Sequence, residues 1–222
     1  MNRILLIVNI IIFTVYFLSA EGILLSNQFA DVMDQEFIMV PTNVLNGQQI
    51  YTLFTSMFMH ASWLHLLGNM LFLYVFGDNV EDIFGHIGYL IFYLICGLAA
   101  AFSYIFVNLY APLISEAIGI SITSDLTSGV LGASGAIAGV LGAYFVLFPK
   151  AKVLSLVLYV ILPIPAFLFL GIWFLLQWVY WATDISSGVA YFAHIGGFLA
   201  GILLAITIGL RRKKIRDARL RL

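Results

Sequence analysis

The chain has 222 residues, of which 63 % are apolar and 9 % are charged, and its mean hydropathy is +1.06. A soluble domain of this size needs far more polar surface, so we expect a single-domain polytopic membrane protein. The formal net charge is −1, and the one cysteine, Cys96, lies in an apolar run. These counts exclude a disulfide framework and a cysteine-based metal site, and we interpret Cys96 as a buried structural thiol.

The first apolar segment has two interpretations. Arg3 precedes the apolar run 4–20, and Ser19-Ala20-Glu21 is a weak signal-peptide cleavage site. The run is longer than the usual hydrophobic region of a signal peptide. We favour a first transmembrane helix with Arg3 on the inner side, because this fits the rest of the chain better.

Six apolar segments are each close to the ~20 residues that a helix needs to cross a bilayer. In lipid, only helices and closed barrels satisfy their backbone hydrogen bonds, and a barrel would show alternating segments of ~10 residues. The predicted fold is therefore an all-α bundle of six transmembrane helices, forming one domain over residues 1–222. The predicted spans are 4–20, 60–76, 88–106, 131–148, 166–181 and 191–210.

The placement of charge predicts the orientation of this bundle. With six spans, every basic residue falls on one side, and the opposite side carries acidic residues but no lysine or arginine. The basic residues are Arg3, Lys150, Lys152, Arg211, Arg212, Lys213, Lys214, Arg216, Arg219 and Arg221. The acidic residues opposite are Glu21, Asp31, Asp34, Glu36, Glu116, Asp125 and Asp184. The positive-inside rule then places both termini in the cytoplasm. This topological role explains the basic tail 211–222, so we expect no nucleic-acid partner. The compact chain fits the plasma membrane of a prokaryote, with an organelle membrane as the alternative.

Two connections are unusual. The external loop 21–59 is rich in apolar side chains, which indicates a structure partly sunk in the outer membrane interface. The segment 153–162 is apolar but short, and it ends at Pro163 and Pro165, which would break a helix. We predict a packed stretch on the cytoplasmic side, with a longer, tilted fifth span as the alternative.

Polar residues of three separate spans fall at one depth. In this topology the second, fourth and sixth spans all run inward, and each carries polar residues near its outer start: His65 and Asn69, then Ser134, then His194. At 1.5 Å per residue, Ser134 and His194 lie within about one turn of the starts of their helices. Polar groups inside a membrane are costly and usually mark function.

Ser134 and His194 together favour nucleophilic catalysis. A serine hydroxyl attacks a carbonyl well only when a base takes its proton, and His194 could later protonate the leaving amine. No carboxylate lies near His194 in any predicted span, and Asp184 in the preceding loop is the closest in sequence. We therefore predict a Ser–His dyad. Taken singly, each residue is more often structural, but their convergence favours the catalytic interpretation.

Small residues predict that the two helices touch. Gly135, Gly139 and Gly142 recur at helical spacing in the fourth span, and Gly197 and Gly201 do so in the sixth. Such stripes let membrane helices approach closely.

His65 and Asn69 lie four residues apart, so their side chains share one face of the second span. They could donate to the oxyanion of an acyl-transfer intermediate, or bond to each other or to the external loop. For His60 we favour a structural role in that loop. A metal site from His60, His65 and His194 is a weaker alternative, because no carboxylate or cysteine lies at that depth. We expect neither a metal nor a cofactor.

Three segments carry a resemblance to a known family. They are His60-Ala-Ser-Trp-Leu-His65-Leu-Leu-Gly-Asn69, Gly132-Ala-Ser134-Gly135 and Ala193-His194-Ile-Gly-Gly197. In order and spacing, over nearly the whole chain, they resemble the rhomboid intramembrane serine proteases.

This resemblance implies the six-helix fold, a Ser134–His194 dyad, and an oxyanion site formed by the Ser134 backbone N–H, His65 and Asn69. It also implies cofactor-free cleavage of single-span membrane proteins near their outer end, after a small residue. The fifth helix and the loop 184–190 would correspond to the family's gate and cap.

The chain departs from the family pattern at two places. Tyr51-Thr52 stand where many relatives carry Trp-Arg, so the anchoring of the external loop differs. Ala138 stands where some relatives place an aromatic ring against the histidine, and Tyr191 or another ring could substitute.

Two other functions are compatible with a bundle of this kind. A non-catalytic rhomboid-like protein that binds membrane clients would not require Ser134 and His194. A small transporter or channel would more often spread ionisable residues along a pathway.

Overall fold

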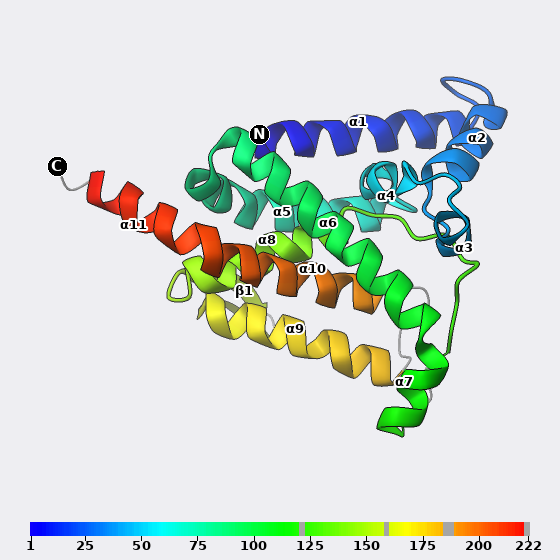
Figure 1. Ribbon diagram of the computed structural model, residues 1–222. Coiled ribbons are helices and arrows are strands. Elements are labelled where there is room, and N and C mark those ends of the chain that lie inside the picture. The colour runs from blue at the N-terminus through cyan, green and yellow to red at the C-terminus, as the bar shows by residue number, and fades with distance from the viewer. Residues whose placement is uncertain (120–122, 158–159, 184–188, 220–222) are drawn as a thin grey trace.

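The computed structural model describes residues 1–119, 123–157, 160–183 and 189–219, and this part of the chain is mostly helical (Figure 1). The helices of the N-terminal half are α1 (Asn2–Ala20), α2 (Asn27–Phe37), α3 (Pro41–Leu45), α4 (Thr52–Thr55), a 3-10 turn (Ser56–Phe58), α5 (Trp63–Phe84), α6 (His86–Leu109) and α7 (Ala111–Ile118). The remaining elements are α8 (Ser134–Leu147), β1 (Lys152–Val157), β2 (Val160–Pro165), α9 (Ala166–Thr183), α10 (Tyr191–Leu204), a π-helical turn (Ala205–Gly209) and α11 (Leu210–Arg219).

Four helical segments of the described chain are long and apolar enough to cross a membrane: Asn2–Ala20, His86–Leu109, Ala166–Thr183 and Tyr191–Arg219. They coincide with the predicted first, third, fifth and sixth spans. The second predicted span, 60–76, is a helix that starts later and runs further, from Trp63 to Phe84, and its polar residues lower its hydropathy. The fourth, 131–148, is a helix of only 14 residues. At 1.5 Å per residue α8 is about 21 Å long, less than the ~30 Å of a hydrocarbon core.

The short helix α8 lies at the centre of the bundle, against α5, α6, α9 and α10. Eleven of its 14 residues are buried, so protein rather than lipid surrounds it. The glycines of α8 and α10 bring the two backbones together. A Cβ atom on Gly197 would collide with the carbonyl oxygen of Gly135, and one on Gly201 with that of Gly139. One on Gly142 would likewise meet the carbonyl oxygen of Phe198.

Besides its contact with α10, the helix α8 also packs closely against α6. Cys96 is free and buried, and its side chain lies where a Cβ on Gly139 would stand. Ala100, one turn further along α6, lies in the same way against Gly135. The glycines Gly135 and Gly139 of α8 therefore allow both α6 and α10 to pack closely against this helix.

Polar contacts join the helices at the end of the bundle where α1 begins and α11 lies (Figure 1). The Asn2 amide donates to the carbonyl of Leu73 at 3.1 Å and to Asp78 at 2.8 Å, and the Tyr89 hydroxyl donates to Asn2 at 2.9 Å. These hydrogen bonds tie α1 to α5 and α6.

At the same end, basic side chains of α11 bond to the last carbonyls of two helices. Arg212 donates to the carbonyl oxygen of Phe84, which ends α5, and Lys213 donates to that of Leu147, which ends α8. Cations at helix C-termini satisfy free carbonyls and complement the helix dipole. The basic tail therefore has a packing role as well as the predicted topological one.

At 153–162 the alternative of a longer fifth span is wrong, and the predicted stretch before the fifth helix takes the form of a hairpin. The chain forms an antiparallel hairpin in which Lys152 pairs with Pro165 and Val157 with Val160, and α9 begins only at Ala166. Val153 is buried in the core and Leu154 is 74 % exposed, so the hairpin packs through only part of its side chains. The prolines exclude a helix, while the β-branched residues favour strands and a two-stranded ribbon tolerates proline at its edges.

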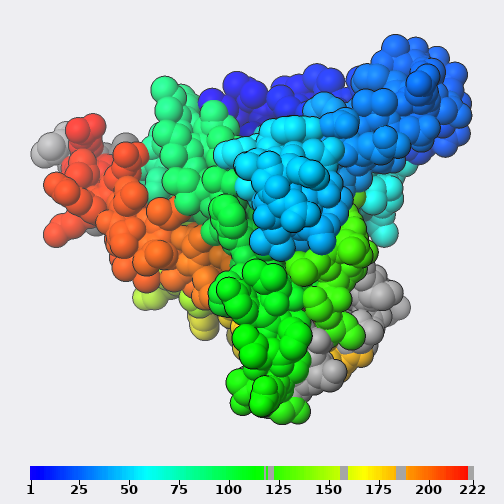
Figure 2. All heavy atoms as spheres, turned by 45° about the vertical axis from the view of Figure 1, so that its right-hand side comes forward, coloured from blue at the N-terminus to red at the C-terminus, as the bar shows by residue number. Residues whose placement is uncertain are grey.

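The predicted external loop 21–59 folds into the short helices α2, α3 and α4. Figure 2, which brings this end of the molecule forward, shows these helices (blue to cyan) above the end of α6 and α7 (green). Ile23, Leu24 and Val32 are exposed apolar side chains of this segment. Its insertion into the membrane interface stays a prediction.

The close α8–α10 contact predicts that alanine lowers stability at one glycine and not at another. Gly201→Ala should destabilise the protein by about 1–3 kcal/mol, the usual cost of overpacking, because its Cβ has no room against Gly139. Gly171→Ala is the matched control, since its Cβ would meet only a Phe145 ring carbon at 3.7 Å. The check is thermal unfolding of both purified variants in detergent. Equal midpoints in the two variants would contradict the close packing.

Candidate active site

Ser134 and His194 meet at the starts of two adjacent helices. Ser134 is the first residue of α8, and His194 lies in the first turn of α10. The Ser134 hydroxyl is 2.8 Å from Nε2 of His194, within the range for proton transfer between a nucleophile and its base. Because Ser134 opens α8, its backbone N–H has no partner within the helix and is available as a donor.

Two residues of α9 hold the other side of the imidazole. Nδ1 of His194 is 2.8 Å from the Oε1 atom of Gln177, and the Trp173 ring lies 6.0 Å from the His194 ring, centre to centre. Trp173 thus supplies an aromatic ring beside His194, where Ala138 cannot. Gln177 was not among the site residues predicted from the sequence. The signal was present, because Gln177 is a polar residue in a predicted membrane span.

Gly132 sets the distance between the start of α8 and His65. Its φ is +125°, a conformation that favours glycine. A Cβ at this position would lie 2.9 Å from Cε1 and Nε2 of His65 and 3.7 Å from the Ser134 hydroxyl oxygen. The structure therefore brings His65 to the backbone that precedes the serine. The Ser62 hydroxyl caps α5 by accepting from the His65 N–H at 3.2 Å, which fixes the start of the helix that carries His65.

Asn69 lines the same cavity as His65, Ser134 and His194. The side chain is 8 % exposed, and its Nδ2 atom is a buried donor with no hydrogen-bond partner among the described residues. Buried donors are usually satisfied, so an unused one beside a cavity is suited to an incoming acceptor. The alternative in which His65 and Asn69 bond to each other is not supported by the contacts of the described chain.

His60 lies behind His65 and not at the serine. It is 1 % exposed, with its ring 5.1 Å from that of His65 and 6.4 Å from that of Phe13 in α1. The His60 ring therefore lies between those of Phe13 and His65 and packs against His65. No group of three or more His, Cys, Asp or Glu side chains within the described ranges is arranged to hold a metal ion.

The segment 123–133 that leads to Ser134 is tied to three parts of the chain. The Asp125 N–H donates to Asn108 of α6 at 2.9 Å, Val130 forms a bridge with Met39, and the Gly132 N–H donates to the carbonyl of Ser56 at 2.9 Å. Hydrogen bonds from Ser128, and then from Thr127, hold the pKa of the Asp125 carboxyl below its ordinary value. The segment 21–59 and the end of α6 thus fix the approach to α8.

Tyr51 and Thr52, which stand where many of the proteins that the chain resembles carry Trp-Arg, anchor the segment 21–59 from within. The Tyr51 hydroxyl donates to Glu36, and the buried Thr52 hydroxyl donates to the carbonyl of Gln49 at 2.7 Å. Leu53, the next residue, packs with Ile105 of α6. These contacts join α2 and α4 to the bundle.

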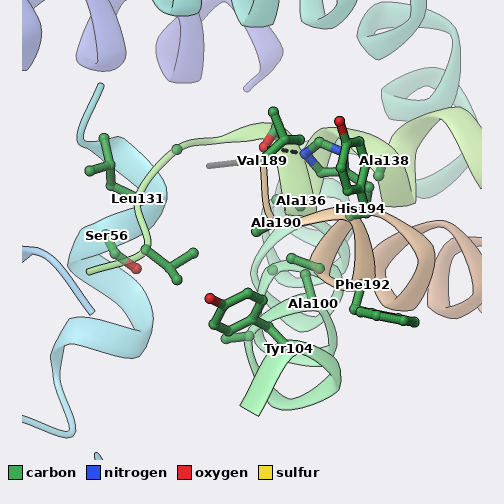
Figure 3. A pocket seen from close by; sticks show the side chains of 18 of the residues that line it. Ser56, Ala100, Tyr104, Leu131, Ala136, Ala138, Val189, Ala190, Phe192 and His194 are labelled. Carbon is green, nitrogen blue, oxygen red and sulfur yellow. Dashed lines mark hydrogen bonds between the residues drawn. The ribbon is translucent and has the colours of Figure 1, made fainter. Parts of the chain in front are cut away.

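The site opens into a cavity of about 980 Å³. Figure 3 shows the His194 side chain at this cavity beside Ala138, with Ala100 and Tyr104 contributed by α6 and Val189 by the segment before α10. Of the predicted cap 184–190, residues 184–188, which include Asp184, lie outside the described ranges. Trp181 of α9 also lines the cavity.

Comparison with known proteins decides the family. The rhomboid domain profile matches residues 47–211, which include every site residue above. The chain belongs to the rhomboid family. This rhomboid is 30 % identical over 171 residues to RHOMBOID-like protein 12, mitochondrial, of Arabidopsis thaliana, which covers 75 % of the chain and 50 % of the relative. It is 31 % identical over 170 residues to Rhomboid protein 1, mitochondrial, of Saccharomyces cerevisiae, covering 74 % and 44 %.

A bacterial relative is also similar. Rhomboid protease AarA of Providencia stuartii is 30 % identical over 174 residues, covering 74 % of this rhomboid and 58 % of the relative. The chain thus spans about half the length of the curated relatives it matches. The family match and the apolar helices establish a multi-pass membrane protein of the rhomboid family.

The crowded surroundings of Gly132 predict that an alanine at this position lowers the reactivity of Ser134. Gly132→Ala should slow the reaction of the Ser134 hydroxyl with a fluorophosphonate by at least about 10-fold, because the new Cβ displaces His65 and strains the backbone. Gly85→Ala is the matched control, since Gly85 also has a positive φ of +74° but no atom within 4 Å of its Cβ position. Both rates are followed by mass spectrometry. A Gly132→Ala rate equal to that of the control would contradict this reading of the site.

Proposed function

We propose that this rhomboid is an intramembrane serine endopeptidase that cleaves single-span membrane proteins. The observation that carries the proposal is the 2.8 Å contact between the Ser134 hydroxyl and Nε2 of His194 at the mouth of a cavity. Family membership adds to it, and one similar protein is named as a protease.

The proposed reaction uses this chain's residues alone. Nε2 of His194 takes the hydroxyl proton while Oγ of Ser134 attacks the peptide carbonyl carbon. The resulting oxyanion accepts hydrogen bonds from the Ser134 N–H, from Asn69 and from His65. His194 then gives its proton to the leaving amine as the C–N bond breaks. Water attacks the acyl ester, His194 takes a proton from this water, and the proton returns to Oγ as the second product leaves.

The position of the site sets the form of the substrate. The cavity lies at the end of the bundle that carries α2, α3, α4 and α7, where α8 and α10 begin. A membrane-spanning substrate would enter sideways from the lipid and be cut near that end. A helical peptide hides each carbonyl in its i to i−4 hydrogen bonds, so substrates that unwind readily around a small residue are favoured.

We propose that α1, α5, α6, α8, α9 and α10 are six spans, with the site toward the outside and both termini in the cytoplasm. The absence of lysine and arginine on the predicted outer side supports this orientation. For location we propose the plasma membrane of a prokaryote, and fractionation of the source cells tests this. Mitochondrial or chloroplastic location is part of the names of several similar proteins.

The test is cleavage of purified single-span proteins by the protein in lipid vesicles. Ser134→Ala and His194→Ala should each lower the cleavage rate by about 10⁴-fold, the scale seen when a nucleophile or its base is removed. Ser155→Ala and His86→Ala are matched controls at the other end of the molecule, and they should cleave at the wild-type rate.

Cleavage that persists in Ser134→Ala would overturn the proposal. A wild-type protein that binds these single-span proteins without cutting any of them would instead favour the non-catalytic client binder.

A further inference from the structure

The inward face of α9 contains one buried polar side chain. The buried residues of α9, all of whose residues the structure describes, are Ala166, Leu170 and Gln177. Leu170, Trp173, Phe174 and Gln177 follow the spacing of a single helix face, and Phe174 stacks on Phe198 of α10 at 4.6 Å. Gln177 is 6 % exposed, whereas Leu175 on the opposite face is 62 % exposed. A buried amide on the packed side of such a helix calls for a specific partner.

The hydrogen bonds of Gln177 fix which way its amide faces. Nε2 of Gln177 donates to the carbonyl oxygen of Trp173 at 3.2 Å. A carbonyl oxygen only accepts, so the amide nitrogen belongs on this side. The amide oxygen then faces Nδ1 of His194, 2.8 Å away, and can only accept from it.

This arrangement determines the tautomer of His194. When Nδ1 carries the proton, the neutral imidazole has its lone pair on Nε2, the atom that faces Ser134. We propose that Gln177 is a positioning residue that holds His194 in the tautomer and orientation able to take the proton of Ser134. The proposal rests on the proposed function above, and it adds a third side chain to the predicted Ser–His dyad.

An amide suits this position physically. A carboxylate would orient the ring too, but burying its charge among apolar side chains costs far more than burying a hydrogen-bonded amide. In the soluble serine proteases, an amide in place of the orienting carboxylate favours the wrong tautomer and lowers kcat about 10⁴-fold. Here the bond to the Trp173 carbonyl prevents the amide from turning its nitrogen toward the ring. The Trp173 ring packs near the imidazole from the same helix.

Three variants separate positioning from packing in the vesicle cleavage assay. Gln177→Leu removes the acceptor, Gln177→Glu keeps an oxygen there, and Val179→Ala is a control at an exposed site of the same helix. Gln177→Leu should lower kcat about 10- to 100-fold with KM unchanged, since the lost bond orients the base and does not touch substrate. Val179→Ala should leave both unchanged.

The pH profile gives a second readout. Within the described residues, Ser134 from α8 and His65 from α5 lie at the site beside His194, and Tyr104 and Asp125 line the same cavity. None of these variants changes them. Gln177→Glu should keep activity and move the acid limb of kcat/KM to higher pH, because a carboxylate favours the imidazolium that must lose its proton.

A measurement without turnover tests the contact itself. In protein labelled with ¹⁵N-histidine, ring-nitrogen shifts report the tautomer, and His194→Ala identifies the His194 signals. We expect the proton on Nδ1 in the wild type, and its redistribution toward Nε2 in Gln177→Leu.

The outcomes of the two experiments are distinguishable. Wild-type protein that has the Nδ1 proton but cleaves nothing would overturn the proposed function and leave the contact standing. A wild-type proton on Nε2 would overturn the role of Gln177. So would a Gln177→Leu variant with unchanged tautomer, whether its kcat is unchanged or falls only because its unfolding temperature falls.

Discussion

At Gly197 and Gly201, the backbone of α10 rests on the carbonyl groups of Gly135 and Gly139 of α8, with no side chain between them. Ser134 directly precedes this contact on α8, and His194 lies three residues before it on α10. A hydrogen bond of 2.8 Å tolerates little displacement, so any side chain that separated the two helices would separate the two functional groups. The glycines of α8 and α10 are therefore required for the short distance between Ser134 and His194.

The other contacts of the site come from parts of the chain that surround this pair of helices. The segment 21–59 and the end of α6 hold the backbone before Ser134, through Met39, Ser56 and Asn108. Helix α9 reaches His194 from the opposite side through Trp173 and Gln177. Protein encloses α8 on its sides, so a helix only about 21 Å long can serve as one of the six proposed spans. Its polar start then lies in the cavity and not in lipid.

Much of this architecture follows from the sequence, because long apolar runs and costly intramembrane polar residues are strong signals. Hydropathy located the helices α1, α6, α9 and α10, and the depth of Ser134 and His194 suggested that they meet. The hairpin at 152–165 escaped prediction, since a short apolar run has no period that separates strand from packed coil. Gln177 escaped because its partner His194 lies on another helix, and only the packing shows that this face of α9 meets the imidazole. The turn at Gly132 depends on a positive φ that no hydropathy pattern reveals.

The central claim is that His194 activates Ser134 inside this bundle. The most direct measurement is the rate at which a fluorophosphonate modifies Ser134, mapped by peptide mass spectrometry, in wild-type protein and in His194→Ala of equal thermal stability. We expect rapid modification at Ser134 in the wild type and a rate lower by about 10³-fold or more in the variant. Equal rates in the two proteins, or modification at another serine, would contradict it.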